Sequence, residues 1–186
     1  MDSNLIFKSL GYLKPARGRM EVLSETKNNA LVIIDYAHSP DALISALKSI
    51  QEIKNRGRII TLFGCGGDRD KDKRQIMGKL ADKYSDIVII TDDNPRNETP
   101  SIIRKEILTG CPNATEIPNR DKAIKHAISN LQKNDLLLIA GKGHETFQAI
   151  GTETLPFDDY TVAKEAIKNI ENSEVINWNL YGQKRI

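Results

Sequence analysis

Four short segments of the sequence combine glycine, proline and charged side chains in patterns that suit the binding of a charged ligand. They read DYAHSP (residues 35–40), GCGGDRDKDKR (64–74), DDNPR (92–96) and GKGHE (141–145). Asp35 ends an apolar run, where a carboxylate can accept ribose hydroxyls, and His38 precedes an expected helix start, where an imidazole can face a phosphate. The glycines of the second segment allow backbone N–H groups to approach an anion closely.

Each segment taken alone also has an ordinary explanation. The glycine-rich segment could be a flexible turn, and residues 68–74 a solvated charge run. His38 could simply satisfy a local backbone group, Asn-Pro commonly starts a turn, and GKGHE could be a plain turn. The glycine-rich segment does not fit the dinucleotide fingerprint, because Arg69 stands where the third glycine belongs. The chain also contains no G-x-x-x-x-G-K-[ST] phosphate loop.

Alternating apolar runs and amphipathic stretches must position these segments. Strands are expected in MEVLS (20–24), ALVIID (30–35), RIITLF (58–63), DIVIIT (86–91), ATEI (114–117) and DLLLIA (135–140), with FQAI (147–150) as a further candidate. Helices are expected from Ser39-Pro40, over about 74–84, from Thr99-Pro100 to a closing Gly110, over 121–131, and over about 159–172. The first two strands are separated by the turn-like ETKNN, which predicts an antiparallel hairpin.

Strand–helix alternation of this kind predicts an α/β fold, with a mostly parallel sheet and helices on both faces. The strands are almost continuously apolar, as expected when both faces of a sheet are covered. In such folds the ligand lies outside the carboxyl ends of the strands. The loops after Asp35, Phe63, Thr91 and Ala140 should therefore converge, and these loops are the four chemistry-bearing segments.

Composition excludes several other classes of function. The 186 residues are enough for one domain, or one domain with tails. A net charge of +2 and 5% aromatic residues give no case for nucleic acid. The apolar runs are too short to span a bilayer, and the first residues do not form a secretory signal, so no membrane insertion and a cytoplasmic location are expected. Two cysteines and three scattered histidines indicate neither a disulfide framework nor a metal site.

Five pieces taken in order are more specific than any one alone: GRMEVL, VIIDYAHSPDAL, LFGCGGDRDKDKR, TDDNPR and AGKGHETFQ. From about residue 18 to residue 166, the chain closely resembles the C-terminal domain of the Mur ligase family of peptidoglycan synthesis, and within it the diaminopimelate-adding ligases. Asp72 departs from the pattern, since the family often has glycine there. The resemblance implies a three-layer α/β/α, Rossmann-like domain with a mixed, mostly parallel six-stranded sheet and one antiparallel strand.

The resemblance also implies that the functions of the enzyme are divided between domains. Residues 1–17 would be a linker from a missing central domain, residues 18–172 the C-terminal domain, and residues 173–186 a tail. In the family, a first domain holds the UDP-sugar and a central one carries the phosphate loop; neither is present here. The full-length enzyme uses ATP and Mg²⁺ to activate the D-glutamate carboxylate of UDP-MurNAc-L-Ala-D-Glu, whose acyl phosphate the incoming amine attacks. This chain alone is expected to be inactive and to hold no catalytic residue.

Site residues carry over from the family motifs. The resemblance assigns ATP to Arg19, Asp35 and His38, and meso-diaminopimelate to Arg69, Asn94, Pro95, Arg96, Gly141 and Glu145. In the family, DNPR marks ligases that add meso-diaminopimelate, while lysine-adding relatives have another tetrapeptide. A planar guanidinium binds a carboxylate through two parallel hydrogen bonds, and Glu145 can meet an ammonium, so the pair suits a zwitterion.

Two other functions remain open from the sequence. One is a free-standing nucleotide- or amino-acid-binding module without catalysis, although the missing third glycine argues against a dinucleotide. The other is a structural interaction domain, supported only by Trp178 and Tyr181 near the end of the chain.

Overall fold

A six-stranded sheet forms the centre of the fold. The computed structural model describes residues 16–26, 28–53 and 56–182, without the side chains of residues 24–25 and 171–182. The strands are β1 (Glu21–Glu25), β2 (Leu31–Asp35), β3 (Ile59–Phe63), β4 (Ile87–Ile90), β5 (Thr115–Glu116) and β6 (Leu136–Ala140). Their order in the sheet is β1-β2-β6-β3-β4-β5, and only β1 pairs with its neighbour in antiparallel fashion. The expected hairpin and the mixed, mostly parallel sheet are confirmed.

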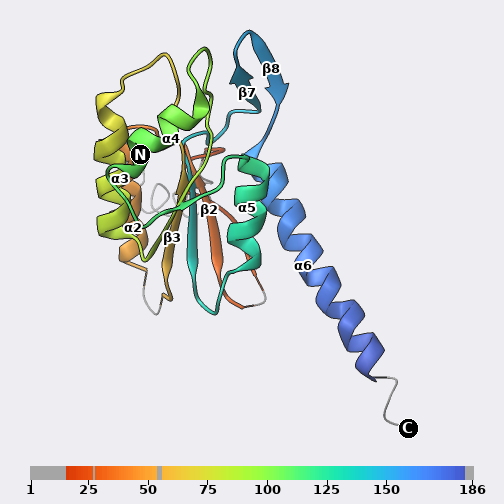
Figure 1. Ribbon diagram of the computed structural model, residues 1–186. Coiled ribbons are helices and arrows are strands. Elements are labelled where there is room, and N and C mark those ends of the chain that lie inside the picture. The colour runs from red at the N-terminus through yellow and green to blue at the C-terminus, as the bar shows by residue number, and fades with distance from the viewer. Residues whose placement is uncertain (1–15, 27, 54–55, 183–186) are drawn as a thin grey trace, which may run out of the picture.

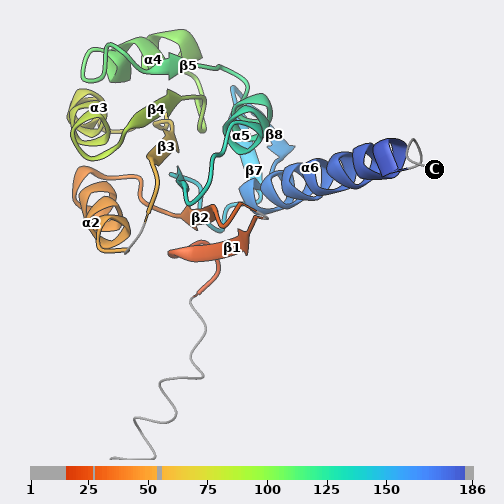
Figure 2. The same ribbon diagram turned by 90° about the horizontal axis from the view of Figure 1, so that it is seen from below.

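Helices cover both faces of this sheet, which makes the fold three-layered (Figures 1 and 2). One face is covered by α2 (Pro40–Gln51), α3 (Asp72–Tyr84) and α4 (Pro100–Leu108), and the other by α5 (Arg120–Ser129) and α6 (Asp159–Gly182). Successive residues of β6 alternate between the two cores: Leu136 and Leu138 face α2 and α3, while Leu137 and Ile139 face α5 and α6.

Local sequence signals explain where the helices begin. The Ser39 hydroxyl accepts a hydrogen bond from the Ala42 N–H at 3.3 Å, and Pro40 occupies the first turn of α2. The Asn119 side chain caps α5 in the same way, through the Lys122 N–H at 2.9 Å. The apolar face of α2 is buried as its spacing predicts.

The structure differs from the sequence expectations at the ends of two helices. Helix α4 ends at Leu108, and Gly110 does not adopt the left-handed conformation of a closing glycine. Its role is close packing instead, because a Cβ at Gly110 would clash with the Gln75 carbonyl oxygen of α3. Helix α6 was expected to end at residue 172 but continues to Gly182, so much of the expected tail is helical. The side chains of Trp178 and Tyr181 lie outside the described part of the structure.

A small second sheet stands beyond the carboxyl end of the main one (Figure 1). The candidate strand FQAI is confirmed as β7 (Phe147–Ile150), and it pairs with β8 (Glu153–Pro156), which the sequence did not indicate. The hairpin also touches the DDNPR segment, through a parallel bridge between Arg96 and Ile150. No helix within the described residues is long and apolar enough to cross a membrane.

Candidate functional site

The four chemistry-bearing segments meet at the carboxyl end of the sheet, as expected. A cleft of about 530 Å³ lies between them. It is lined by Tyr36, His38, Ser39, Pro40, Gly66, Arg69, Asp70, Lys73, Asp93, Asn94, Arg96, Gly141 and Glu145. Six of the nine residues singled out in the sequence are in this lining: His38, Arg69, Asn94, Arg96, Gly141 and Glu145. The other three, Arg19, Asp35 and Pro95, lie outside it.

The hairpin β7–β8 holds the DDNPR segment in an unusual backbone conformation. Arg96 has a φ of +51°, in the left-handed region that a side chain disfavours. Its N–H donates to the Ala149 carbonyl at 3.0 Å, and its own carbonyl accepts from the Gly151 N–H at 2.7 Å. These two bonds to the hairpin offset the local strain and fix the direction of the Arg96 side chain.

The Arg96 guanidinium crosses to the glycine-rich segment. Its Nη1 donates to the carbonyl oxygens of Gly67 at 2.9 Å and Asn94 at 3.4 Å. A Cβ on Gly66 would lie 2.8 Å from the same Nη1, so glycine there leaves room for the guanidinium. Among the described contacts only Nη1 is engaged, which leaves Nη2 and Nε available to a ligand in the cleft.

Pro95 and Arg69 occupy different environments. Pro95 is buried, and its carbonyl packs so closely on Gly67 that a Cβ on that glycine would clash with it. Pro95 therefore shapes the loop from behind the cleft. Arg69 is exposed, and its Nη1 donates only to the neighbouring Asp68 carbonyl at 2.9 Å, so its guanidinium can turn toward the cleft.

Glu145 belongs to a buried polar network that joins two of the segments. Its Oε2 accepts from Asn94 Nδ2 at 2.9 Å and from Lys142 Nζ at 3.0 Å. Lys142 is fully buried and also donates to Asn94 Oδ1 at 3.0 Å. The cleft thus presents a guanidinium from one segment and a carboxylate from another.

Tyr36 and His38 line another wall of the cleft, and cationic and aromatic groups gather around the Tyr36 ring. The Arg19 guanidinium lies 4.7 Å from the centre of the Tyr36 ring, within the range of a cation–π contact. The His38 and His144 rings lie 4.4 Å and 4.9 Å from the same ring. His38 is exposed, and its Nδ1 lies 2.8 Å from the Tyr36 carbonyl oxygen. The local backbone contact that the sequence left open for His38 is therefore present.

Asp35 has a structural contact of its own. Its Oδ2 accepts from the Met20 N–H at 2.7 Å, which ties the start of the β1–β2 hairpin to the end of β2. The glycines of GKGHE bring that segment against the same wall. Gly143 has a φ of +52°, and a Cβ there would lie 2.6 Å from the Tyr36 Cβ and 2.8 Å from the Gly18 carbonyl oxygen. The segment from 141 to 145 therefore touches both walls of the cleft.

A layer of buried arginines supports the loops from beneath. Arg120 and Asp159 are both fully buried and paired through two 2.7 Å bonds, and Arg120 Nη2 also donates to the Ala140 carbonyl at 3.0 Å. Arg104 pairs with Asp92 and with Glu116 at 2.6 Å. These pairs hold the ends of β4 and β6, from which two of the segments start.

The charge run 68–74 is not solvated throughout, because its last residue, Arg74, is fully buried. Arg74 contacts Glu98 at 2.9 Å and Glu106 at 2.5 Å. The hydrogen bond from Arg74 holds the pKa of Glu98 at about 2. Residues 68–72 of the run are exposed and therefore solvated, while Lys73 is half-buried. The last residue of the run instead anchors the glycine-rich segment to the loop before α4.

Both cysteines are free and buried, in agreement with the absence of a disulfide framework. Burial raises the pKa of the Cys65 thiol to about 12, so this thiol of the glycine-rich segment is protonated at neutral pH.

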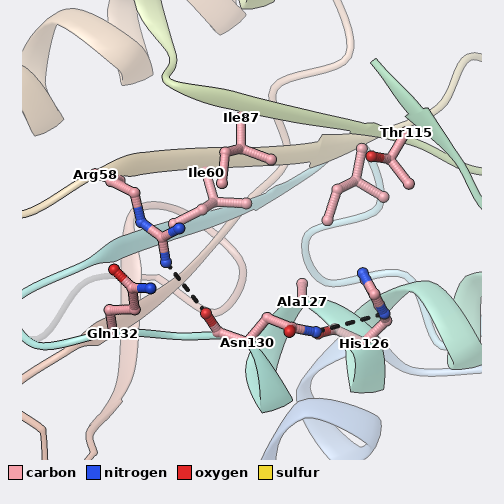
Figure 3. Close-up of a pocket in the computed structure, with 9 residues that line it drawn as sticks. Arg58, Ile60, Ile87, Thr115, His126, Ala127, Asn130 and Gln132 are labelled. Atoms are coloured by element: carbon pink, nitrogen blue, oxygen red, sulfur yellow. Dashed lines mark hydrogen bonds between the residues drawn. The ribbon is translucent and has the colours of Figure 1, made fainter. Parts of the chain in front are cut away.

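A second, smaller cavity of about 280 Å³ lies at the amino ends of β3 and β4 (Figure 3). Its apolar floor is Ile60, Ile87 and Ile89, and Arg58 lies at its edge. The Arg58 guanidinium is already held by the Asn130 carbonyl at 3.2 Å and the Asp135 carboxylate at 2.6 Å. Arg58 is therefore not free to bind a charged ligand, and the cleft at the carboxyl ends of the strands is the better candidate site.

Four residues stand out among those that reasoning from the sequence did not assign to the cleft. Tyr36 and Asp93 line it, His144 stacks on Tyr36, and Lys142 supports Asn94 and Glu145. The only signal for Lys142 was a lysine between two glycines, and all four lie inside the segments that were singled out.

Comparison with known proteins gives consistent matches. The family profile described as "Mur ligase, glutamate ligase domain" matches residues 18–143. A UDP-N-acetylmuramoyl-L-alanyl-D-glutamate--2,6-diaminopimelate ligase of Agrobacterium fabrum is 51% identical over 168 residues, which cover 90% of this chain and 34% of that relative. A ligase of the same name from Rickettsia typhi is 52% identical and covers 86% and 32%. The chain thus spans about a third of the length of these relatives.

Solved structures support the same fold. A UDP-N-acetylmuramoyl-L-alanyl-D-glutamate--2,6-diaminopimelate ligase superimposes with a TM-score of 0.77 at 37% identity, over 92% of this chain and 35% of that one. A UDP-N-acetylmuramate-alanine ligase from Thermotoga maritima superimposes with a TM-score of 0.60 at 18% identity, over 91% and 36%, which shows the fold alone. The expected Rossmann-like α/β fold is confirmed.

Proposed function

Because this chain belongs to the Mur ligase family, we propose that it is the C-terminal, amino-acid-binding domain of an ATP-dependent ligase that adds meso-diaminopimelate to UDP-MurNAc-L-Ala-D-Glu. The observation that carries the proposal is the pairing of charges in one cleft. Arg96 and Glu145 come from separate segments, line the same cleft and present opposite charges. An amino acid with a carboxylate and an ammonium at its far end fits such a pair.

In the proposed reaction, ATP transfers a phosphoryl group to the D-glutamate carboxylate, and the amine of diaminopimelate attacks the resulting acyl phosphate. The new C–N bond replaces the C–O bond to phosphate, the phosphate leaves, and the amine loses a proton. This chain contributes placement of the amine and charge complementarity at the far end of the amino acid. Arg69, Asn94, Arg96, Gly141 and Glu145 form this wall, with Pro95 shaping it from behind.

We assign ATP to Arg19, Asp35 and His38, with Tyr36 as an additional contact. His38 and Tyr36 line the cleft, while Arg19 and Asp35 lie outside its lining. Support comes from the exposed His38 in the cleft and from the Arg19–Tyr36 stack, which offers a cation and a ring face. Mg²⁺ is expected in the full-length enzyme. The described residues include no group of three His, Cys, Asp or Glu side chains that could hold a metal.

We divide the chain into a linker (1–17), the C-terminal domain (18–172) and a tail (173–186). The first two ligase domains would belong to the same, longer protein. The described part of the linker is residues 16–17. A cytoplasmic location belongs to the proposal, because ATP must be supplied to the reaction.

The test is ligation by the longer protein and by this chain, each with ATP, the UDP-linked dipeptide and meso-diaminopimelate. We expect the longer protein to release phosphate and form a tripeptide product, detected by its mass. The 186-residue chain should release none, because it contains no phosphate loop of the G-x-x-x-x-G-K-[ST] type. Turnover by the chain alone, or no diaminopimelate product from the longer protein, would contradict the proposal. The alternative of a free-standing module predicts tight ligand binding by the chain alone without any ligation partner.

A further inference from the structure

Lys142 is a fully buried lysine behind the amino-acid wall of the cleft. Lysines are rarely buried completely unless they are paired, because an ammonium loses its hydration when it is taken out of water. Lys142 Nζ donates to Asn94 Oδ1 and to Glu145 Oε2, both at 3.0 Å. Its two partners are both residues of the cleft lining, whereas Lys142 itself does not line the cleft.

The first consequence concerns the orientation of the Asn94 amide. An ammonium can only donate, so the oxygen of Asn94 must face Lys142. The same Oδ1 accepts from the Ala149 N–H at 3.0 Å, so both of its acceptor positions are filled by protein donors. The amide nitrogen is therefore turned the other way, where it donates to Glu145 Oε2 at 2.9 Å. One of its two hydrogens is used, and the second is available to a carboxylate in the cleft.

The second consequence concerns Glu145. Its Oε2 receives hydrogen bonds from both Lys142 and Asn94, while none of the described contacts uses Oε1. The Glu145 side chain keeps 21% of its surface exposed in the cleft. Lys142 therefore holds Oε2 in hydrogen bonds within the protein and leaves Oε1 for a ligand.

We propose that Lys142 is a positioning residue, which acts through Asn94 and Glu145 to set one donor and one acceptor for a zwitterionic amino-acid end in the cleft. The inference rests on the proposed function for the identity of that amino acid. The Lys142 ammonium explains why Asn94 presents a donor while Glu145 presents a free oxygen. Without the ammonium, the amide can turn over and the carboxylate can rotate, so the pair no longer has one arrangement.

The test is Lys142→Met in the complete ligase that carries this domain. Methionine has a similar length and fits an apolar site, but it donates nothing. We expect the KM for meso-diaminopimelate to rise by about 10- to 100-fold, the change for losing a hydrogen bond to a charged group. The KM for ATP should stay within about twofold. The matched control is Lys125→Met, at an exposed lysine on α5 whose partner among the described residues is Asp121, and it should leave both values unchanged.

A purely structural role for Lys142 predicts a different pattern. It would lower the melting temperature and reduce activity toward all substrates together, with no selective change in the KM for diaminopimelate. That pattern, or an unchanged KM for diaminopimelate, would overturn the inference. A wild-type ligase that forms no diaminopimelate product would instead overturn the proposed function, and this failure is visible before any variant is made.

A double-mutant cycle tests the route of the effect. If Lys142 acts through Glu145, the rise in KM for Lys142→Met combined with Glu145→Gln is smaller than the product of the two single rises. Independent, multiplicative effects would contradict that route. Should Lys142→Met fail to fold, Lys142→Gln takes its place with the same expected split between the two KM values, because its shorter amide cannot supply an ammonium to both partners.

Discussion

Replacing Asp159 by asparagine should strongly destabilise this chain. Asp159 and Arg120 are both fully buried, and the carboxylate accepts two 2.7 Å hydrogen bonds from the guanidinium. Burial by itself lowers the pKa of Arg120, but Asp159 reverses the direction and the net pKa is raised. Asp159→Asn removes that contribution, but arginine keeps its proton in proteins because its ordinary pKa lies far above neutral pH. The guanidinium therefore stays charged in the variant, while its counter-charge is gone.

The expected loss of stability is large because Arg120 has few other hydrogen-bond acceptors. Nη2 keeps its bond to the Ala140 carbonyl, and Nη1 has no partner even in the wild type. Removing one member of a buried ion pair costs about 3–5 kcal/mol. Asparagine still offers one oxygen to Arg120, so we take the lower end, about 3 kcal/mol. For a chain of this size, that corresponds to a fall in Tm of about 6–12 °C.

Thermal and urea unfolding of the 186-residue chain measure the effect, and the wild type is expected to unfold in one cooperative transition. The control is Asp121→Asn, the same substitution in an exposed pair with Lys125, which should cost less than about 1 kcal/mol. The double variant Arg120→Met/Asp159→Leu should recover most of the loss, because it leaves no charge unpaired. If Asp159→Asn costs no more than Asp121→Asn, the buried pair does not hold the fold as described.

Two further predictions concern acid stability and close packing. The hydrogen bond from Arg74 lowers the pKa of Glu98 from 4.5 to about 2 in the folded chain, so the stability that Glu98 contributes is complete above about pH 4.5 and is lost as the pH falls toward 2. Glu98→Gln should flatten the fall in unfolding free energy over that window, and an unchanged slope would argue against it. Gly143→Ala should destabilise the chain more than Gly151→Ala, since both glycines have positive φ but only Gly143 packs against Tyr36; equal melting temperatures would contradict the steric argument.

Much of the fold could be predicted because its signals are local. The strands are continuous apolar runs, and Ser39, Pro40 and Asn119 mark helix starts that the structure confirms. Ligands lie beyond the carboxyl ends of parallel strands, and this rule predicted that four segments distant in the sequence lie together. Strand β8 could not be found in this way, because all four of its residues are exposed and form no apolar pattern.

The supporting residues of the site were beyond local reasoning. Arg74 looks like one more charge in a polar run, and its partners Glu98 and Glu106 are 24 and 32 positions away. Lys142 meets Asn94 across 48 positions of sequence. Burial of such groups depends on charges that arrive from other elements, so the sequence indicates which residues could bind a ligand but not which ones hold them in place.

The specificity of Arg96 tests the central claim most directly. Lysine lacks the distal carboxylate of meso-diaminopimelate, so it leaves the half-buried guanidinium without a partner at Nη2 and Nε. An unmatched charge of this kind costs about 2–5 kcal/mol, and partial exposure places Arg96 near 2–3 kcal/mol, or about 30- to 150-fold. The measurement is kcat/KM for each amino acid, in the complete ligase with wild-type Arg96, Arg96→Ala and Arg96→Lys. The account predicts that Arg96→Ala reduces the preference for diaminopimelate over lysine by that factor, with the KM for ATP little changed, and that Arg96→Lys restores only part of it, because a point charge cannot replace the planar fork. A ratio that is the same in wild type and Arg96→Ala would contradict the account and place the recognition of the amino acid elsewhere in the cleft.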